Sequence, residues 1–231
     1  RGIRLKLVHV VPRIDQEAAG PSYSVPRLCQ ALAARGHEVE LSCIAAREPI
    51  PGVRLDVHPD WSILKRFEVS TSLARALRRK AEHVDIVHSH SLWSMVNVAS
   101  GLVVPGRRAK LVTSPRGTLS PWALSRTRQL KRLLKPLQWR ALERADLLHA
   151  TSEQELIDIR AQGLYAPVAV IPNGIDVPVD LPARIDSERR RVPFLGRVFP
   201  EARFIYLHRD PRPVLASMIE AWGSGRFCTY P

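Results

Sequence analysis

The feature that most constrains the fold is a regular alternation of short apolar segments with helix-like segments over the first 176 residues. Seven segments are apolar and rich in β-formers, and they span residues 3–11, 39–44, 53–57, 85–90, 110–114, 146–151 and 168–171. Between the first two, apolar residues form one helical stripe, made of Val25, Leu28, Cys29, Leu32 and Ala33. Strands that alternate with helices imply crossover connections. We therefore expect an α/β fold, a Rossmann-like doubly wound parallel sheet, with a short strand–helix tail appended to it.

The loops that follow the strands are where such a fold binds ligands, because ligands of doubly wound sheets lie outside the carboxyl ends of the strands. The sequence has neither a G-x-G-x-x-G after the first strand nor a P-loop, which argues against a dinucleotide enzyme and a P-loop NTPase. A single Gly20 precedes the first helix. It either lets backbone N–H groups approach a diphosphate or simply forms a turn.

The composition is that of a globular protein with an unusual charge. Hydrophobic residues make up 45% of the 231, and 35 Lys and Arg against 22 Asp and Glu leave a net charge of +13. No apolar run approaches the ~20 residues that span a bilayer. Three scattered cysteines, Cys29, Cys43 and Cys228, predict no disulfide framework and no metal site, and favour a cytoplasmic location. The charge alone allows nucleic acid, an anionic membrane or phosphorylated ligands as partners.

More than half of the positive charge lies in residues 116–144, which hold eight basic residues and one acidic residue. The segment also carries an apolar helical stripe, made of Leu130, Leu133, Leu134, Leu137 and Ala141. A basic amphipathic helix suits an anionic membrane surface, and it equally suits a solvated charged face. No aromatic platform accompanies the charge, so nucleic acid is not an expected partner.

Five segments, in order, resemble the N-terminal domain of family 4 glycosyltransferases. They read A-G-P-S-Y-S-V-P-R-L-C-Q-A-L-A-A-R-G-H-E-V (19–39), D-I-V-H-S-H-S-L-W (85–93), S-P-R-G-T-L-S-P-W-A-L (114–124), A-D-L-L-H-A-T-S-E-Q-E (145–155) and V-I-P-N-G-I-D (170–176). The resemblance implies a retaining GT-B enzyme of two Rossmann-like domains, which requires no metal and no cofactor. The first domain would hold a glycan or lipid-linked acceptor, and the second a nucleotide sugar as donor.

The resemblance also implies roles for particular residues. Gly20 matches the loop position that faces the donor diphosphate, and the acceptor-side loop after the fourth strand holds His88, Ser89, His90 and Trp93. Arg116 stands where many relatives carry a functional histidine, and its guanidinium could hold a phosphate or carboxylate of an acceptor. Two plainer readings stay open, that His88 is a packed core histidine and that Arg116 is a surface charge. No catalytic residue is assigned.

The tail resembles a different family. Residues 192–227 are similar to the 3′-phosphate-binding segment of sulfotransferases. The resemblance implies that Arg209 and Ser217 hold the 3′-phosphate of phosphoadenosine phosphosulfate. The N-terminal phosphosulfate-binding loop of that family is absent from this sequence.

The expected organisation is a glycosyltransferase-like domain at residues 1–178, a linker at 179–191 and a sulfotransferase-like segment at 192–231. The sequence starts without an initiator Met, so we expect a piece of a longer protein. The expected function is sugar transfer from a nucleotide sugar in polysaccharide biosynthesis, with the chain inactive alone because the donor domain is missing. The alternatives are a binder of phosphoadenosine phosphosulfate and a basic membrane-associated module at the inner membrane face.

Overall fold

A computed structural model describes residues 3–15, 20–59, 66–126 and 128–174 of the chain. Contacts divide the chain into two units, Arg1–Gly174 and Ile175–Pro231, and the description below concerns the first. The predicted linker and the sulfotransferase-like segment lie outside the described residues. The boundaries expected at residues 178 and 191 stay predictions.

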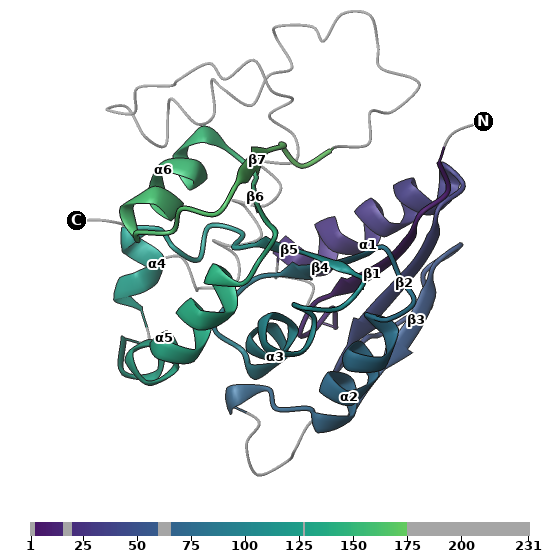
Figure 1. Ribbon diagram of the computed structural model, residues 1–231, viewed down its shortest axis with the longest axis horizontal. Helices are drawn as coiled ribbons and strands as arrows, with labels where there is room; N and C mark the ends of the chain where they lie inside the picture. The colour runs from purple at the N-terminus through teal and green to yellow at the C-terminus, as the bar shows by residue number, and fades with distance from the viewer. Residues whose placement is uncertain (1–2, 16–19, 60–65, 127, 175–231) are drawn as a thin grey trace, which may run out of the picture. The chain divides into compact units, whose positions relative to one another are not determined.

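Seven strands form one sheet in the order β3-β2-β1-β4-β5-β6-β7 (Figure 1). The strands are β1 (Lys6–Val10), β2 (Glu38–Cys43), β3 (Arg54–Val57), β4 (Ile86–His90), β5 (Lys110–Ser114), β6 (Leu147–Ala150) and β7 (Val168–Val170). All neighbouring pairs are parallel, which confirms the predicted fold class. The strand order reverses between β1 and β4, and the carboxyl ends of these two strands therefore flank the crevice where this fold binds ligands.

Six helices are described with the sheet: α1 (Gly20–Ala34), α2 (Thr71–Lys80), α3 (Met95–Val103), α4 (Pro121–Ser125), α5 (Arg128–Glu143) and α6 (Glu153–Ala161). Four of them begin after a serine whose hydroxyl accepts a hydrogen bond from the backbone N–H three residues later. These serines are Ser70, Ser94, Ser120 and Ser152. Such a cap stabilises a helix by about 1 kcal/mol, and it places each helix start at a defined residue.

Two apolar cores lie on the two faces of the sheet. On one face, α1 buries Val25 and Cys29 against β1 and β2. On the other face, α2 and α3 bury Leu73, Leu77 and Val96 together with side chains of β1, β4, β5 and β6. Each fully buried aliphatic side chain stabilises the fold by about 1.5–3 kcal/mol. The alternation of strand residues between these cores sets which side chains of β1 and β4 face α1.

Two aspartates connect neighbouring strands by hydrogen bonds at their amino ends. Asp85 precedes β4, and its Oδ2 accepts a hydrogen bond from the backbone N–H of Lys6 at 2.8 Å. Asp146 precedes β6 and accepts in the same way from Leu111 at 2.8 Å. The bond from Lys6 and the nearby Arg108 guanidinium lower the pKa of the Asp85 carboxyl. These bonds hold β1 beside β4 and β5 beside β6 in register.

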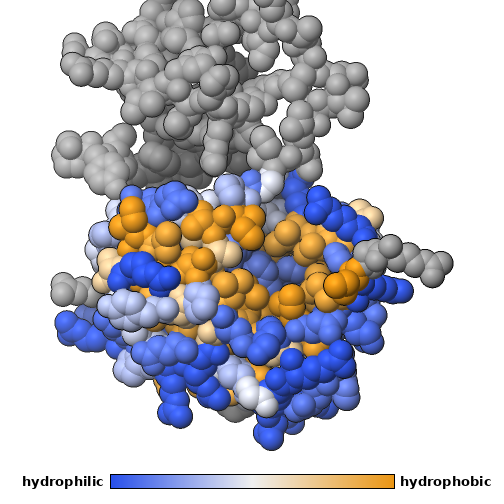
Figure 2. Space-filling model, turned by 45° about the horizontal axis from the view of Figure 1, so that its top comes forward, coloured by the Kyte–Doolittle hydropathy of each residue, from blue (hydrophilic) through white to orange (hydrophobic). Residues whose placement is uncertain are grey.

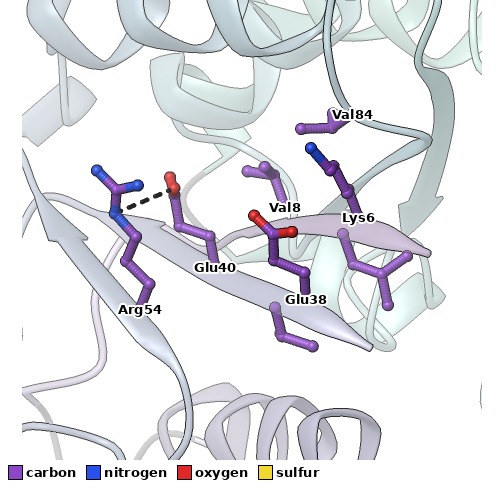
Figure 3. A pocket seen from close by; sticks show the side chains of 8 residues that line it. Lys6, Val8, Glu38, Glu40, Arg54 and Val84 are labelled. Atoms are coloured by element: carbon purple, nitrogen blue, oxygen red, sulfur yellow. Dashed lines mark ion pairs between the residues drawn. The ribbon is translucent and has the colours of Figure 1, made fainter. Parts of the chain in front are cut away.

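The hollow drawn in Figure 3 lies at the amino ends of the strands, opposite the carboxyl ends, where ligands of this fold bind. It is lined by Lys6, Leu7, Val8, Glu38, Val39, Glu40, Arg54 and Val84. Lys6, Glu38 and Arg54 are the first residues of β1, β2 and β3, and Arg54 lies 3.6 Å from the carboxylate of Glu40. The hollow therefore opens where the strands begin, and ligands of this fold bind where they end.

The predicted apolar stripe of α5 is buried only in part. Two of its members, Leu133 and Leu137, are 67% and 42% exposed. The buried face consists of Leu134, Gln138, Ala141 and Leu142. A polar residue belongs to this face because Gln138 Oε1 accepts a hydrogen bond from the backbone N–H of Trp93 at 2.9 Å. Packing of α5 on α3 thus overrides the simple apolar pattern.

The described surface mixes hydrophobic and hydrophilic residues. Figure 2 shows one face on which hydrophobic residues gather in patches that hydrophilic residues border. No helix of the described ranges combines the length and the apolar character that crossing a bilayer requires.

The close approach of α3 to α5 gives a prediction. A Cβ added at Gly101 would lie 2.7 Å from the backbone oxygen of Ala141. We expect Gly101→Ala to lower the free energy of unfolding by about 1–3 kcal/mol through overpacking, measured by urea denaturation. Gly20→Ala is the control, since a Cβ there meets nothing within 4 Å. Equal stability of the two variants would contradict the tight helix contact.

Candidate functional site

A row of polar side chains crosses the centre of the sheet. His9 of β1 is the register partner of His88 in β4, and His90 is the partner of Ser114 in β5. Side chains alternate between the faces of a strand, so His88 and His90 share one face. His149 of β6 extends the row through a hydrogen bond to Ser114. The row brings together two residues that were predicted to belong to the site.

A first hydrogen-bond chain starts at Arg116 and has a fixed direction. Arg116 Nη2 lies 3.1 Å from His90 Nδ1, and His90 Nε2 lies 2.9 Å from His9 Nδ1. A guanidinium can only donate, so Nδ1 of His90 must accept. A neutral His90 therefore carries its proton on Nε2 and donates it to His9.

A second chain runs from β4 to β6. His149 Nε2 lies 2.9 Å from the carbonyl oxygen of Ile171, which can only accept. The Ser114 hydroxyl lies 2.7 Å from both His149 Nδ1 and His88 Nε2. With a neutral His149, Ser114 donates to Nδ1 of His149 and accepts from Nε2 of His88. The lone pair on Nδ1 of His88 is then available to another donor.

The three central histidines are neutral at physiological pH. Burial, together with a smaller contribution from the Arg116 charge, lowers the pKa of His9 to about 4. Burial also lowers the pKa of His88 and His90 well below 6.5, with smaller contributions from the neighbouring histidines and Arg116. These rings can orient a ligand by hydrogen bonds, but they do not supply a proton as imidazolium ions.

The same three histidines meet a geometric condition for a metal site. Each offers one ring nitrogen, and these atoms lie within 4.8 Å of one another, a donor set that suits Zn²⁺. A metal on Nε2 of His90 requires the proton on Nδ1, where it would face the donating Arg116 guanidinium. The observed hydrogen bonds therefore favour a metal-free cluster in this arrangement.

The Arg116 side chain contacts three separate parts of the chain. Its Nη1 donates to Asn173 Oδ1 at 2.6 Å and to Ser24 Oγ of α1 at 3.3 Å, and its Nη2 donates to His90. Its backbone is in the left-handed region at φ 58°, and Gly117 follows at φ 72°. Arg116 is thus a half-buried cation that joins α1 to the carboxyl end of β4, and not a freely solvated surface charge.

Glu155 holds the loop that carries Arg116. Its Oε1 accepts a hydrogen bond from the backbone N–H of Gly117 at 2.7 Å. Its Oε2 accepts from both the N–H and the hydroxyl of Thr151, each at 2.7 Å. Both carboxylate oxygens are therefore occupied, and Glu155 positions Arg116 through the backbone without touching its guanidinium.

The other predicted site residues have packing partners. The buried Ser89 hydroxyl accepts from Asn97 Nδ2 at 3.1 Å, on the sheet face opposite the histidines. Trp93 Nε1 donates to the carbonyl of Thr118 at 3.2 Å, and its ring packs on Trp139. Gly20 begins α1. Their predicted roles in acceptor or diphosphate binding stay predictions.

Four site residues were not singled out from the sequence: His9, Ser114, His149 and Glu155. Ser114, His149 and Glu155 lie within motifs that were quoted as a whole. His9 and Ser114 become neighbours of His88 and His90 only through the strand order. Period-two alternation places residues on a face, but it does not say which strands are adjacent.

The neutral histidines give a pH prediction. The unfolded chain takes up a proton on His9 near pH 6.5, while the folded chain resists it down to about pH 4. The free energy of unfolding should therefore fall as the pH drops through this window, by about 3 kcal/mol from His9 alone. Urea titrations of wild type and His9→Gln check this, with the exposed His83→Gln as control. A flat wild-type curve between pH 6.5 and 4 would refute it.

Comparisons with known proteins identify the family of the chain. Glycosyltransferase Family 4 matches residues 19–178, and no curated protein matches. The segment from residue 192 onward lies beyond that match, and its resemblance to sulfotransferases gains no support.

Solved structures share the fold. HepE of Anabaena in complex with UDP has a TM-score of 0.54 and 16% identity, over 85% of this chain and 50% of that one. HepE with UDP-glucose gives the same TM-score at 15% identity. Sucrose-phosphate synthase from Thermosynechococcus elongatus has a TM-score of 0.55 and 17% identity, over 94% of this chain and 74% of that one. The chain thus spans about half the length of HepE, and the family match over most of its residues shows that it belongs to glycosyltransferase family 4.

Proposed function

We propose that this chain is the acceptor-side half of a glycosyltransferase that transfers sugar from a nucleotide sugar to a glycan or a lipid-linked acceptor. The observation that carries the proposal is the meeting of three elements at one point. Arg116 after β5 contacts both His90 at the end of β4 and Ser24 in α1. This point lies at the carboxyl edge of the sheet, beside the β1–β4 switch. Family membership supports the reaction class, and HepE has been crystallised with UDP and UDP-glucose.

Within this proposal, His88 orients a sugar hydroxyl. Of the three central histidines it is the one that is not fully buried. Its Nε2 is engaged by Ser114, so Nδ1 is the atom left to accept a hydrogen bond. The lowered pKa of His88 keeps this lone pair free of a proton at neutral pH. His88 therefore acts as a positioning acceptor and not as a general acid.

A titration of the ¹⁵N-labelled chain with a panel of neutral saccharides tests the acceptor site. We expect saccharide-dependent amide shifts at residues 20–24, 88–93 and 116–118. His88→Phe should weaken binding by about five- to tenfold, the effect of one hydrogen bond. The exposed His83→Phe is the matched control. Shifts centred on Lys6 and Glu38, or affinity unchanged in His88→Phe, would contradict the acceptor role.

Turnover is expected to require the donor half of the enzyme, because the family's second domain holds the nucleotide sugar. The purified 231-residue chain should neither hydrolyse nucleotide sugars nor transfer their sugar. Robust transfer by this chain alone would refute the proposed division of roles.

A second candidate function is attachment to an anionic membrane, and the orientation of α5 favours it. The exposed Leu133 and Leu137 lie four residues apart, on one side of the helix. Exposed Arg132, Lys135 and Arg140 lie on the same helix. Apolar side chains bordered by cations match the interface of a bilayer that contains anionic lipids.

Sedimentation with vesicles tests the attachment. The chain should bind vesicles containing phosphatidylglycerol at low salt and be released as salt screens the attraction. Replacing Leu133 and Leu137 together by serine should weaken binding at least about tenfold, since the apolar contact is lost. Ile157→Ser, at an exposed position of α6, is the control. Equal binding to uncharged vesicles would exclude this second function.

A further inference from the structure

Each tryptophan that the structure describes lies beneath a basic side chain. The pairs are Arg126 over Trp122, Lys131 over Trp93 and Lys135 over Trp139, with the cation 4.9, 5.5 and 4.7 Å from the ring centroid. A cation is attracted to an aromatic face within roughly 6 Å. We call these six residues the tryptophan row.

The three pairs form one continuous surface. The rings of Trp93 and Trp139 lie 5.8 Å apart. Lys131, which covers Trp93, also donates a hydrogen bond to the carbonyl of Ala123 in α4, the residue after Trp122. The helices α4 and α5 lie side by side (Figure 1). The tryptophan row therefore extends from α4 across to α5.

Trp122 presents its ring to solvent. It is 56% exposed, whereas Leu124 packs against the core, because two residues correspond to about 200° around a helix. The cap at Ser120 sets this orientation by fixing the start of α4. Trp93 and Trp139 are half-buried. The row thus offers one open ring, and not the series of rings on which successive nucleic-acid bases stack.

The cations of the tryptophan row are not matched by acidic residues. Within the described ranges, Arg126, Lys131 and Lys135 form no ion pair with a carboxylate. Partial burial and, to a smaller extent, the charge of Arg126 lower the pKa of the Lys131 ammonium. A surface with concentrated, unmatched positive charge attracts an anionic partner.

The tryptophan row lies on a different side of α5 from the exposed leucines. Leu133 and Leu137 each follow a lysine of the row by two residues, which is about 200° around the helix. The buried Leu134 faces the core between the two sides. A bilayer that takes up the leucines would not cover the row, so the row calls for a separate partner.

One end of the tryptophan row lies at the carboxyl edge of the sheet. Trp93 belongs to the loop after β4, which ends at His90. Its Nε1 donates to the carbonyl of Thr118 in the loop after β5 at 3.2 Å. Ligands of this fold bind at that edge. A chain-like ligand held there can extend outward over α4 and α5.

We propose that the tryptophan row binds an acidic oligosaccharide. A sugar ring packs its C–H face on the exposed ring of Trp122, and the sugar carboxylates accept hydrogen bonds from Arg126 and Lys131. A guanidinium suits this task because it can bind a carboxylate through two parallel hydrogen bonds. That this glycan is the acceptor of sugar transfer rests on the proposed function; its binding to the row does not.

Calorimetric titration of the 231-residue chain with oligogalacturonate tests the proposal. The control ligand is the methyl ester of the same oligosaccharide, which keeps the sugar rings and loses the charges. We expect saturable binding of the acid, much weaker binding of the ester, and an affinity for the acid that falls as salt screens the attraction.

Variants assign the binding to the row. Trp122→Ala should weaken binding of oligogalacturonate about five- to tenfold through the lost packing, and Arg126→Met about tenfold through the lost charge-assisted hydrogen bonds. Both side chains are exposed, and thermal melting checks that the variants fold. Tyr165→Ala and Arg78→Met remove an exposed aromatic ring and an exposed cation outside the row and are the matched controls.

The leucines separate the glycan surface from a membrane surface. Replacing Leu133 and Leu137 together by serine should leave the affinity for oligogalacturonate unchanged, while it weakens binding to vesicles that contain phosphatidylglycerol. Loss of oligogalacturonate binding in this double variant would contradict the proposal, because the glycan would then bind through the leucines and not through the row.

Three further results would overturn the proposal: no saturable binding of oligogalacturonate, equal affinity for its methyl ester, or unchanged affinity in Trp122→Ala. The titration with neutral saccharides and His88→Phe reports separately on the proposed acceptor site. Binding of oligogalacturonate through Trp122 without saccharide shifts near His88 would support the row and refute the acceptor role of His88. The opposite pair of results would refute the row alone.

Discussion

The hydrogen bond from the Arg116 guanidinium to Nδ1 of His90 organises the polar centre of this domain. Because a guanidinium never accepts, it sets the proton of neutral His90 on Nε2 and directs that proton to His9. The same cation disfavours charging either ring, and it opposes a metal on His90. One donor thus decides the tautomer of His90, and it adds to the burial that keeps the three rings neutral. The consequence is a neutral hydrogen-bonding surface beside a single localised cation.

Keeping that cation in place strains the backbone of Arg116 itself. A left-handed backbone at a residue other than glycine costs of order 1 kcal/mol or more, and Arg116 adopts φ 58°. The cost is offset by Glu155, which accepts hydrogen bonds from the backbone N–H of Gly117 and from that of Thr151, just before α6. Glu155, in the first turn of α6, therefore determines where the side chain of Arg116 points in the loop after β5. Strain of this kind is found where a residue's position matters for binding.

The fold was predictable from the sequence because strand and helix periodicities are local. Asp85 and Asp146 even mark the strand starts, since each accepts a hydrogen bond from a neighbouring strand. The orientation of α5 was not predictable, because Leu133 and Leu142 are equivalent in any propensity. Leu142 is buried and Leu133 is exposed because two contacts fix which side of α5 faces the core. These are the close approach of Gly101 to Ala141 and the hydrogen bond between Gln138 and Trp93. His9 could not be assigned to the site from the sequence for a similar reason, since strand order alone brings it to His88.

A second half-buried cation in the same domain shows that the fold can neutralise such a charge. Lys80 of α2 contacts the carboxylates of both Glu40 and Asp56, so its charge is matched within β2 and β3. Arg116, at the carboxyl edge, has neutral described partners and an unpartnered Nε. The two cations therefore differ in how their charge is balanced: Lys80 contacts its carboxylates directly, whereas Arg116 is influenced by Glu155, whose carboxylate binds Gly117 and Thr151.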